Sequence, residues 1–200
     1  MEKIIHLPEP DFRGSIPVEI ALLKRRSVRK FSNKPLTLKE ISQLLWALQG
    51  ITHFEGFRTA PSAGALYPLE IYLVIFSVEK LTRGVYKYNP YRHEIELIKI
   101  GDFKTELFSA CLGQEWVIEG AVSFIITGIY DRTTGKYGSR GIRYVDMEAG
   151  HSAQNLLLQA TGLGLGCVPV GAFYDNHLRR IIEAKQDVFP LYVIPCGRLI

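Results

Sequence analysis

The spacing of apolar and polar positions predicts helices and strands that alternate along the chain. Thr37 and Glu40 fit a capping box, and apolar residues then recur at helical spacing as far as Gly50, so a helix is predicted there. Dense apolar, β-branched runs over residues 69–76 and 121–130 predict buried strands.

The same patterns give the remaining elements. Helices are predicted over residues 17–26, 103–112, 144–161 and 176–184, a hairpin over 85–88 and 95–98, and short strands over 167–172 and 191–196. Residues 1–16 are predicted to form an irregular arm, and the glycine-rich residues 132–141 a mobile loop. Because the order lacks regular βαβ repeats, a three-layered α+β fold with helices on both faces of a sheet fits best.

Length and composition are those of a single globular domain spanning residues 1–200, without repeats or a flexible linker. The net charge of +4 suits an anionic ligand but not a nucleic-acid partner. No signal peptide is evident, and the apolar runs are shorter than the roughly 20 residues that a membrane helix needs.

Cysteine and histidine spacing argues against a metal site. The three cysteines contain no CxxC pair, and no histidines have ligand spacing, so neither zinc nor a redox disulfide is expected. Reduced, buried thiols in a cytoplasmic protein are the expectation.

The first candidate motif is Arg-Arg-Ser-Val-Arg-Lys-Phe at residues 25–31. Arg25, Arg26 and Arg29, with the Ser27 hydroxyl, place several donors at a predicted helix end, and these are the groups that phosphate oxygens accept from. A solvated basic patch is the alternative. Nucleic acid is a weaker interpretation, because no aromatic platform surrounds the cluster.

The second motif, residues 58–68, contains a run of small residues from Ala60 to Ala65. Small side chains let a backbone approach a flat ligand closely, and Ser62 can donate to a heteroaromatic edge. An ordinary turn before the next strand is the alternative.

The third motif, residues 162–171, approaches a dinucleotide-binding fingerprint without meeting it. Cys167 or Pro169 stands where glycine is needed, and the stretch leads from a helix into a strand, the reverse of the required order. We expect instead a helix stop, then a strand whose N–H groups near Val170 and Gly171 face a ligand. A flavin needs such donors near N5, N1 and O2.

Together these segments resemble the nitroreductase family and, within it, the SagB-type dehydrogenase branch. The matching segments follow the family's order over almost the whole chain: residues 25–31, 61–68, 84–90 with His93 and Glu96, 136–144, 148–155, 162–166 and 195–198.

The resemblance implies a three-layer α-β-α fold with a mostly antiparallel sheet, one FMN per active site, and a homodimer with its active sites at the interface. The residues implied for phosphate and ribityl oxygens are Arg25, Arg26, Ser27, Arg29 and Arg198. Those implied to line the flavin from the partner chain are Pro61, Ser62, Ala63, Gly64, Ala65 and Leu66. Val168, Pro169, Val170 and Gly171 would lie along the ring, with Gln154 and Asn155 in support.

The implied activity is hydride transfer through flavin N5, from NAD(P)H to an electron-poor small molecule such as a nitroaromatic or a quinone. One alternative is azoline oxidation in a modified peptide, for which Lys136 and Tyr137 are the candidate proton-transfer pair unless they are a solvated loop pair. The chain is short for that branch, which favours the reductase. A flavin-binding module without turnover is the remaining alternative.

Overall fold

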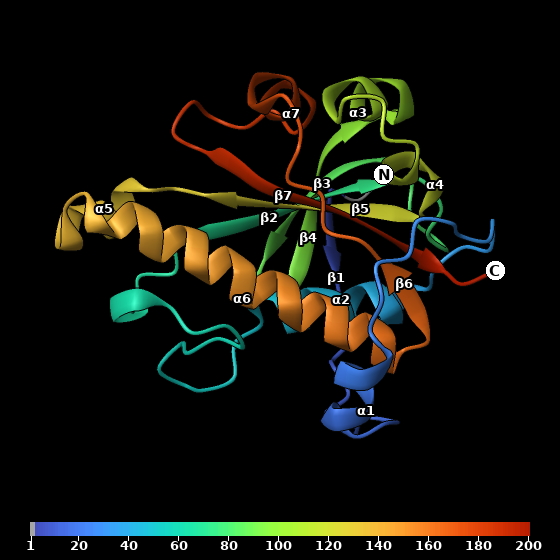
Figure 1. The fold of residues 1–200 in the computed structure, drawn as a ribbon, viewed down its shortest axis with the longest axis horizontal. Helices are drawn as coiled ribbons and strands as arrows, with labels where there is room; N and C mark the ends of the chain where they lie inside the picture. The colour runs from blue at the N-terminus through green and yellow to red at the C-terminus, as the bar shows by residue number, and fades with distance from the viewer. Residues whose placement is uncertain (1–2) are drawn as a thin grey trace.

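One antiparallel sheet runs through the centre of the molecule in the computed structural model, which describes residues 3–200 (Figure 1). Its strands lie in the order β1-β4-β3-β2-β5-β7-β6, and each neighbouring pair is antiparallel. The strands are β1 (Ile4–His6), β2 (Leu69–Ile75), β3 (Gly84–Asn89), β4 (Glu94–Ile100), β5 (Val122–Gly128), β6 (Leu165–Cys167) and β7 (Phe189–Arg198).

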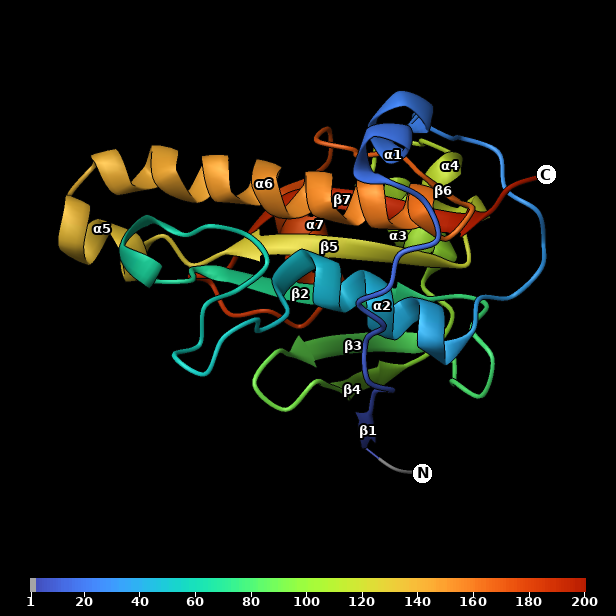
Figure 2. The same cartoon turned by 90° about the horizontal axis from the view of Figure 1, so that it is seen from below.

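Helices lie on both sides of the sheet, as Figure 2 shows from below. On one side are α1 (Val18–Lys24), α2 (Leu38–Gln49), α5 (Asp131–Tyr137) and α6 (Arg140–Gly162); on the other are α3 (Lys104–Ala110), α4 (Trp116–Glu119) and α7 (Asp175–Ile181). A short 3-10 turn, η1 (Ala63–Ala65), precedes β2. The predicted three-layered α+β architecture is therefore confirmed.

The alternation of side chains along β2 divides the core in two. Leu69, Ile71, Leu73 and Ile75 pack in one apolar cluster with α2 and α6, whereas Tyr72, Val74 and Phe76 pack in a second cluster with α3 and α7. Successive residues of a strand point to opposite faces, so a strand buried on both faces reads as the continuous apolar run seen in the sequence.

The predicted capping of α2 is confirmed. The Thr37 hydroxyl accepts from the Glu40 N–H at 3.2 Å, and the Glu40 carboxylate accepts from the Thr37 N–H at 2.7 Å. Gly50 ends the helix, its N–H donating to the Trp46 carbonyl at 2.7 Å. Both ends of α2 could be predicted because the hydrogen-bonding partners lie within four residues of each other in the sequence.

The prediction of a mobile loop over residues 132–141 is wrong. The segment forms α5 and the first turn of α6, with Gly138 in a left-handed conformation (φ 58°) between the two helices. A Cβ on Gly141 would lie 2.8 Å from the Thr134 amide nitrogen, so this glycine permits close helix packing rather than mobility.

Two other boundaries also differ from the prediction. The strand predicted over residues 167–172 ends at Cys167, beyond which Val170 makes an isolated bridge to Val193. The arm predicted over residues 1–16 contains the edge strand β1, paired with β4; residues 1 and 2 lie outside the described part.

His93 attaches the N-terminal arm to the sheet. One ring nitrogen lies 2.7 Å from the Ser42 hydroxyl and 3.1 Å from the Pro8 carbonyl oxygen, and the other lies 2.9 Å from the Tyr88 hydroxyl. Burial lowers the pKa of His93, although the Pro8 carbonyl opposes this. The hairpin motif therefore has a structural role at His93.

Candidate functional site

The basic segment follows α1 and lies beside β6. Ser27 bridges to Cys167, and the Val28 N–H donates to the Cys167 carbonyl at 3.0 Å. Arg25 lines a cavity of about 520 Å³ at the C-terminal end of α6. Across residues 3–200, neither Arg25 nor Arg29 forms an ion pair; the Arg29 guanidinium lies 5.4 Å from the centre of the Trp116 ring. These two cations remain available to an anion.

Arg26 and Arg198 have partners within the chain. Arg26 donates to the carbonyls of Leu23 and Arg25, at 2.9 and 2.8 Å, and so closes the end of α1. Arg198 donates to the Glu40 carboxylate at 2.9 Å and to the Pro35 carbonyl at 3.0 Å. Arg26 is part of the basic segment, and Arg198 lies beside it, because its carbonyl accepts from the Ser32 N–H at 2.9 Å; a phosphate contact for either stays a prediction.

The donors expected in the third motif are fewer than predicted. The Val170 N–H bonds the Val193 carbonyl at 2.8 Å, the Val168 N–H bonds the Pro195 carbonyl at 3.3 Å, and Pro169 has no N–H. Gly171 is exposed, and a Cβ built there meets nothing within 4 Å. The Val170 N–H is therefore not free to donate to a ligand, and among residues 168–171 Gly171 is the one that faces open space.

The small-residue segment is a strained turn. Ala65 and Tyr67 have positive φ values of 54° and 45°, conformations that cost about 1–2 kcal/mol for residues with a Cβ. The Ser62 hydroxyl accepts from the Tyr67 N–H at 2.9 Å and holds the turn closed. Strain of this kind concentrates at binding and catalytic sites.

Lys136 and Tyr137 converge on this turn from the last turn of α5. A Cβ built on Gly64 would lie 2.7 Å from the Tyr137 hydroxyl and 3.0 Å from the Lys136 amine. The Tyr137 ring also packs edge-on against Tyr144 of α6, with ring centres 5.3 Å apart. The structure thus brings the predicted proton-transfer pair to the segment predicted to line a flavin.

Glu148 is a functional candidate that sequence reasoning missed. It lies on the buried face of α6, only 2% exposed, and one carboxyl oxygen has no hydrogen-bond partner within residues 3–200. Burial raises its pKa to about 7, against the lowering effects of a Ser62 hydrogen bond and the Arg58 charge. The available signal was an acidic residue within the apolar stripe of Val145, Ala149 and Leu156.

Asn155 and Gln154 lie farther along α6. The Asn155 side chain donates to the Thr59 carbonyl at 3.1 Å, which fixes the approach to the small-residue turn, and Gln154 is half-buried. Asn155 also lines a cavity of about 660 Å³ beneath the N-terminal arm.

The two groups of candidate residues lie near opposite ends of α6. Tyr144 contacts Tyr137 near the N-terminal end, whereas Thr161 lines the cavity that contains Arg25. Seventeen residues of α-helix correspond to about 25 Å. One chain therefore presents a cationic group and a small-residue turn at separate places (Figure 1).

The residues fit FMN in part. Arg25, Arg29 and the exposed Ser27 supply donors for a phosphate monoester. Gly171 offers backbone without side-chain bulk, which suits a planar ring, whereas the Tyr137 hydroxyl and the Lys136 amine occupy the space beside Gly64. Among residues 3–200, no group of three or more histidine, cysteine or acidic side chains is placed to hold a metal ion. Within the same residues, no helix has the length and apolar character needed to span a membrane.

Comparison with known proteins gives consistent matches. Residues 22–198 match the model of the nitroreductase family. The chain is 49% identical to a nitroreductase-family protein of Methanocaldococcus jannaschii over 98% of this chain and 96% of that protein.

Two solved structures are similar along nearly the whole chain. A nitroreductase from Ralstonia eutropha has a TM-score of 0.86 and 28% identity, covering 100% of this chain and 90% of that one. A chain of the Escherichia coli microcin synthetase McbBCD complex, solved with truncated pro-MccB17 bound, has a TM-score of 0.77 and 26% identity, covering 97% and 77%.

Proposed function

The chain belongs to the nitroreductase family of oxidoreductases, and we propose that it is an FMN-dependent enzyme whose active site requires two copies of the chain. The observation that carries the proposal is that Arg25 and Arg29, which flank Ser27 in the sequence, form no ion pair within residues 3–200, together with the open backbone at Gly171. This donor set matches a phosphate monoester attached to a planar ring.

Each group of residues has a distinct task in this proposal. Arg25, Ser27 and Arg29 bind the phosphate, and Arg198 keeps β7 in place beside them through Glu40. The Gly171 N–H donates to the ring system. When bound, FMN supplies reversible hydride transfer at its N5 atom.

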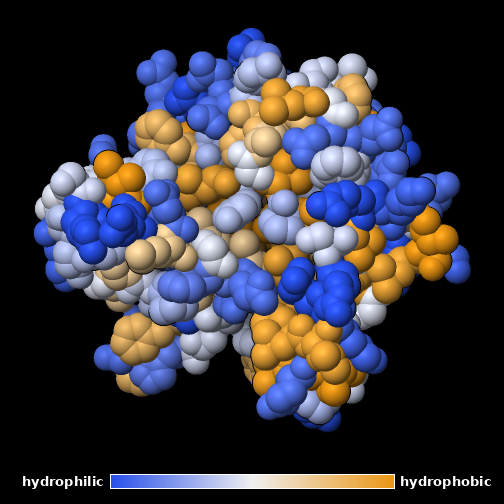
Figure 3. All heavy atoms as spheres, in the orientation of Figure 1, coloured by the Kyte–Doolittle hydropathy of each residue, from blue (hydrophilic) through white to orange (hydrophobic). Residues whose placement is uncertain are grey.

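The need for a second copy follows from the distance along α6. Because the small-residue turn and the basic segment of one chain are separated by about 25 Å of helix, we propose that Pro61–Leu66 of one chain completes the site of the other. Exposed apolar residues on the same side of the molecule support such an interface: Val18, Leu22 and Leu23 of α1 are 57, 55 and 68% exposed. Figure 3 shows this apolar patch over α1.

The proposed reaction takes electrons from NAD(P)H and delivers them to a nitroaromatic or a quinone. The test is anaerobic mixing of the FMN-loaded protein with NADH or NADPH, followed by addition of a quinone. Bleaching of the flavin absorbance and its recovery on adding the quinone are expected, at rates well above those of free FMN. If neither nucleotide bleaches the flavin, NAD(P)H is refuted as the electron donor.

Azoline oxidation is the second candidate, supported by the convergence of Lys136 and Tyr137 on Gly64 and by the similarity to the microcin synthetase chain. In this reaction a thiazoline peptide loses two hydrogens, which oxygen finally accepts as hydrogen peroxide. The test is mass spectrometry of a thiazoline peptide incubated aerobically with the FMN-loaded protein and a partner cyclase. Conversion that is lost in Lys136→Met but kept in Lys185→Met, an exposed control, supports this candidate; no conversion by the wild type counts against it.

A further inference from the structure

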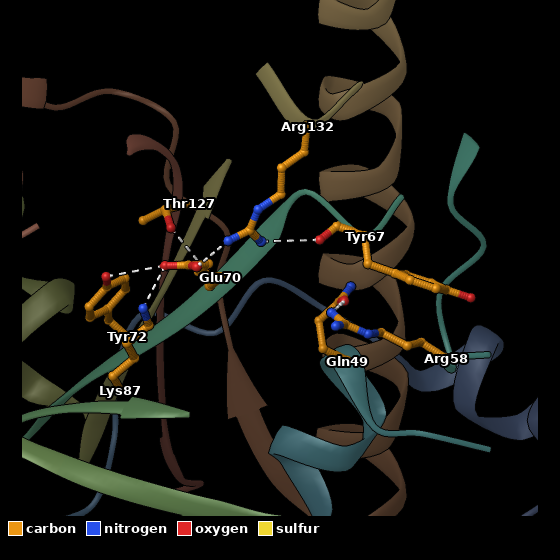
Figure 4. Close-up of polar contacts among 8 residues, drawn as sticks. All are labelled: Gln49, Arg58, Tyr67, Glu70, Tyr72, Lys87, Thr127 and Arg132. Carbon is orange, nitrogen blue, oxygen red and sulfur yellow. Dashed lines mark hydrogen bonds and ion pairs between the residues drawn. The ribbon is translucent and has the colours of Figure 1, made fainter. Parts of the chain in front are cut away.

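The sheet opens between β2 and β3 at one end. Pairing of these strands stops at Tyr72 with Lys87, although β2 continues its pairing with β5 to Leu69 and β3 continues with β4 to Asn89. A cavity of about 330 Å³ lies at this fork, lined by residues of both strands and by Gln49 and Arg58. Figure 4 shows five of the polar residues that line it, Gln49, Arg58, Glu70, Lys87 and Arg132.

One wall of the fork carries two unsatisfied donors. Arg58 donates to the Gln49 side-chain oxygen at 2.7 Å, which leaves the Gln49 amide nitrogen and the Arg58 Nε without hydrogen-bond partners in the described chain. Gln49 is 1% exposed. The Arg58 guanidinium is held between Tyr67 and Tyr91, at 4.5 and 5.5 Å from the ring centres. A buried donor without a hydrogen-bond partner is unfavourable, so this wall favours an acceptor with more than one oxygen.

Another wall carries an unsatisfied acceptor. Glu94 is 5% exposed; one carboxylate oxygen accepts from Asn89 at 3.1 Å, and the other has no hydrogen-bond partner in residues 3–200. This second oxygen, Oε2, does have an ion-pair contact, the ring of His6 at 3.5 Å, which is 80% exposed and attracts the carboxylate only when protonated. This oxygen favours a cationic donor.

The other charges of the fork are already matched. Glu70 pairs with Lys87 and with Arg132, each at 2.7 Å, and Glu96 pairs with Lys3 at 2.8 Å. Burial acts to raise the pKa of Glu70, but Lys87 and Arg132 outweigh it and hold the pKa below its usual value. The groups left for a ligand are therefore Arg58, whose charge also acts on Glu148, with the Gln49 amide on one wall, and the Glu94 carboxylate on another.

We propose that this fork is a binding site for a zwitterionic amino acid, whose carboxylate accepts from Gln49 and Arg58 and whose ammonium donates to Glu94. The cavity volume is at the lower end of the range for small-ligand sites. Tyr88, Pro90 and Tyr91 of the hairpin supply the apolar lining. The site does not depend on the flavin proposal, because none of its donors or acceptors is assigned to FMN.

The test is a thermal-shift screen of the purified chain against the standard L-amino acids one at a time, with and without FMN, followed by calorimetric titration of those that raise the melting temperature. We expect at least one amino acid to bind saturably. Its N-acetyl and carboxamide derivatives, which each lack one charge, should bind about tenfold more weakly or worse, because each charged hydrogen bond is worth about 1.5–3 kcal/mol.

Variants locate the binding. Glu94→Gln and Gln49→Leu should each weaken binding about tenfold or more, and Glu106→Gln on the exposed face of α3 should leave it unchanged. Arg58→Met, at a half-buried position, provides the same test if Glu94→Gln does not fold. Absence of saturable binding by the wild type would overturn the proposal. Wild-type affinity in both Gln49→Leu and Arg58→Met would also overturn it. An equal rise in melting temperature in the wild type and all variants would do the same, because a solute excluded from the protein surface stabilises every variant alike.

Discussion

Glu148 is a carboxyl group that is 2% exposed on α6, and burial raises its pKa to about 7. Arg25, Ser27 and Gly64 were identifiable because motifs of neighbouring residues carried them. Glu148 was not, since its partner Ser62 lies 86 positions earlier and only the packing of α6 brings the two together. The Val170 N–H was wrongly predicted to be a free donor for the same reason: its hydrogen-bond acceptor is the Val193 carbonyl, which lies on another strand.

Replacing Glu148 with glutamine should remove a pH dependence of stability. Its pKa is about 7 in the fold and 4.5 ordinarily, so between these values the folded state keeps a proton that the unfolded state releases. The free energy of unfolding of the wild type should therefore fall as pH rises from about 4.5 to about 7, and this contribution should be level above that range. Urea unfolding at pH 5 and pH 8 measures the difference.

The Glu148→Gln variant should lose less stability than the wild type between these two pH values. Glu106→Gln, at an exposed position, is the matched control and should follow the wild type. Identical pH dependence in Glu148→Gln and the wild type would contradict the buried carboxyl group's role.

Gly64→Ala should destabilise the protein and disturb the pair of residues beside it. Alanine at this position must keep the left-handed backbone conformation of Gly64, which costs about 1–2 kcal/mol for a residue with a Cβ. The new Cβ would also lie 2.7 Å from the Tyr137 hydroxyl. Gly135→Ala in α5 is the control: nothing lies within 4 Å, so it should stabilise the helix by about 0.5–1 kcal/mol. Chemical denaturation measures both, and equal effects of the two substitutions would refute the argument.

Elements were predictable where local signals suffice. α2 was predicted at both ends because Thr37, Glu40 and Gly50 are neighbours of the helix they bound. α5 was missed because Gly135 and Gly138 suggest a loop, although Gly138 only separates two helices and Gly141 lets them pack closely. Which residues pair between neighbouring strands could not be predicted from the sequence either. Cys167 and Cys196 are opposite each other in the register of β6 and β7, and burial together with Cys196 raises the pKa of Cys167.

The capping box of α2 should contribute measurably to stability. Thr37→Ala removes the hydroxyl that accepts from Glu40, and loss of such a cap costs about 1 kcal/mol. Thr105→Ala in α3 is a matched control at an exposed helical position. The midpoint of urea unfolding should fall for Thr37→Ala and stay near the wild-type value for Thr105→Ala; an unchanged midpoint for Thr37→Ala would show that the cap is energetically neutral.

At the scale of the whole molecule, the layered fold followed from the alternation of apolar runs, but the association of two chains did not. The exposed apolar residues of α1 become a coherent surface only when the helix is placed against α6. No pattern in the sequence identifies that surface as an interface between two chains, so the dimer stays a prediction.

Leu23→Asp should disrupt the proposed dimer. A charge at a 68% exposed apolar position is tolerated in a monomer but opposes burial between two chains. Light scattering after size-exclusion chromatography should give about half the wild-type mass, with weaker FMN binding, because each site needs both chains. Leu112→Asp, 50% exposed near α3 on the other side of the sheet, should stay dimeric. A wild type that is already monomeric while binding FMN fully would contradict the two-chain site.

Arg25 and Arg29 are the residues through which we expect this chain to bind FMN, and titration of the purified protein with FMN measures that binding. We predict saturable binding of one FMN per chain, with affinity at least about tenfold weaker in the Arg25→Ala/Arg29→Ala double variant and unchanged in Arg180→Ala, whose side chain is exposed on α7. Failure of the folded wild-type protein to bind FMN, or equal affinity in the double variant, would contradict the account.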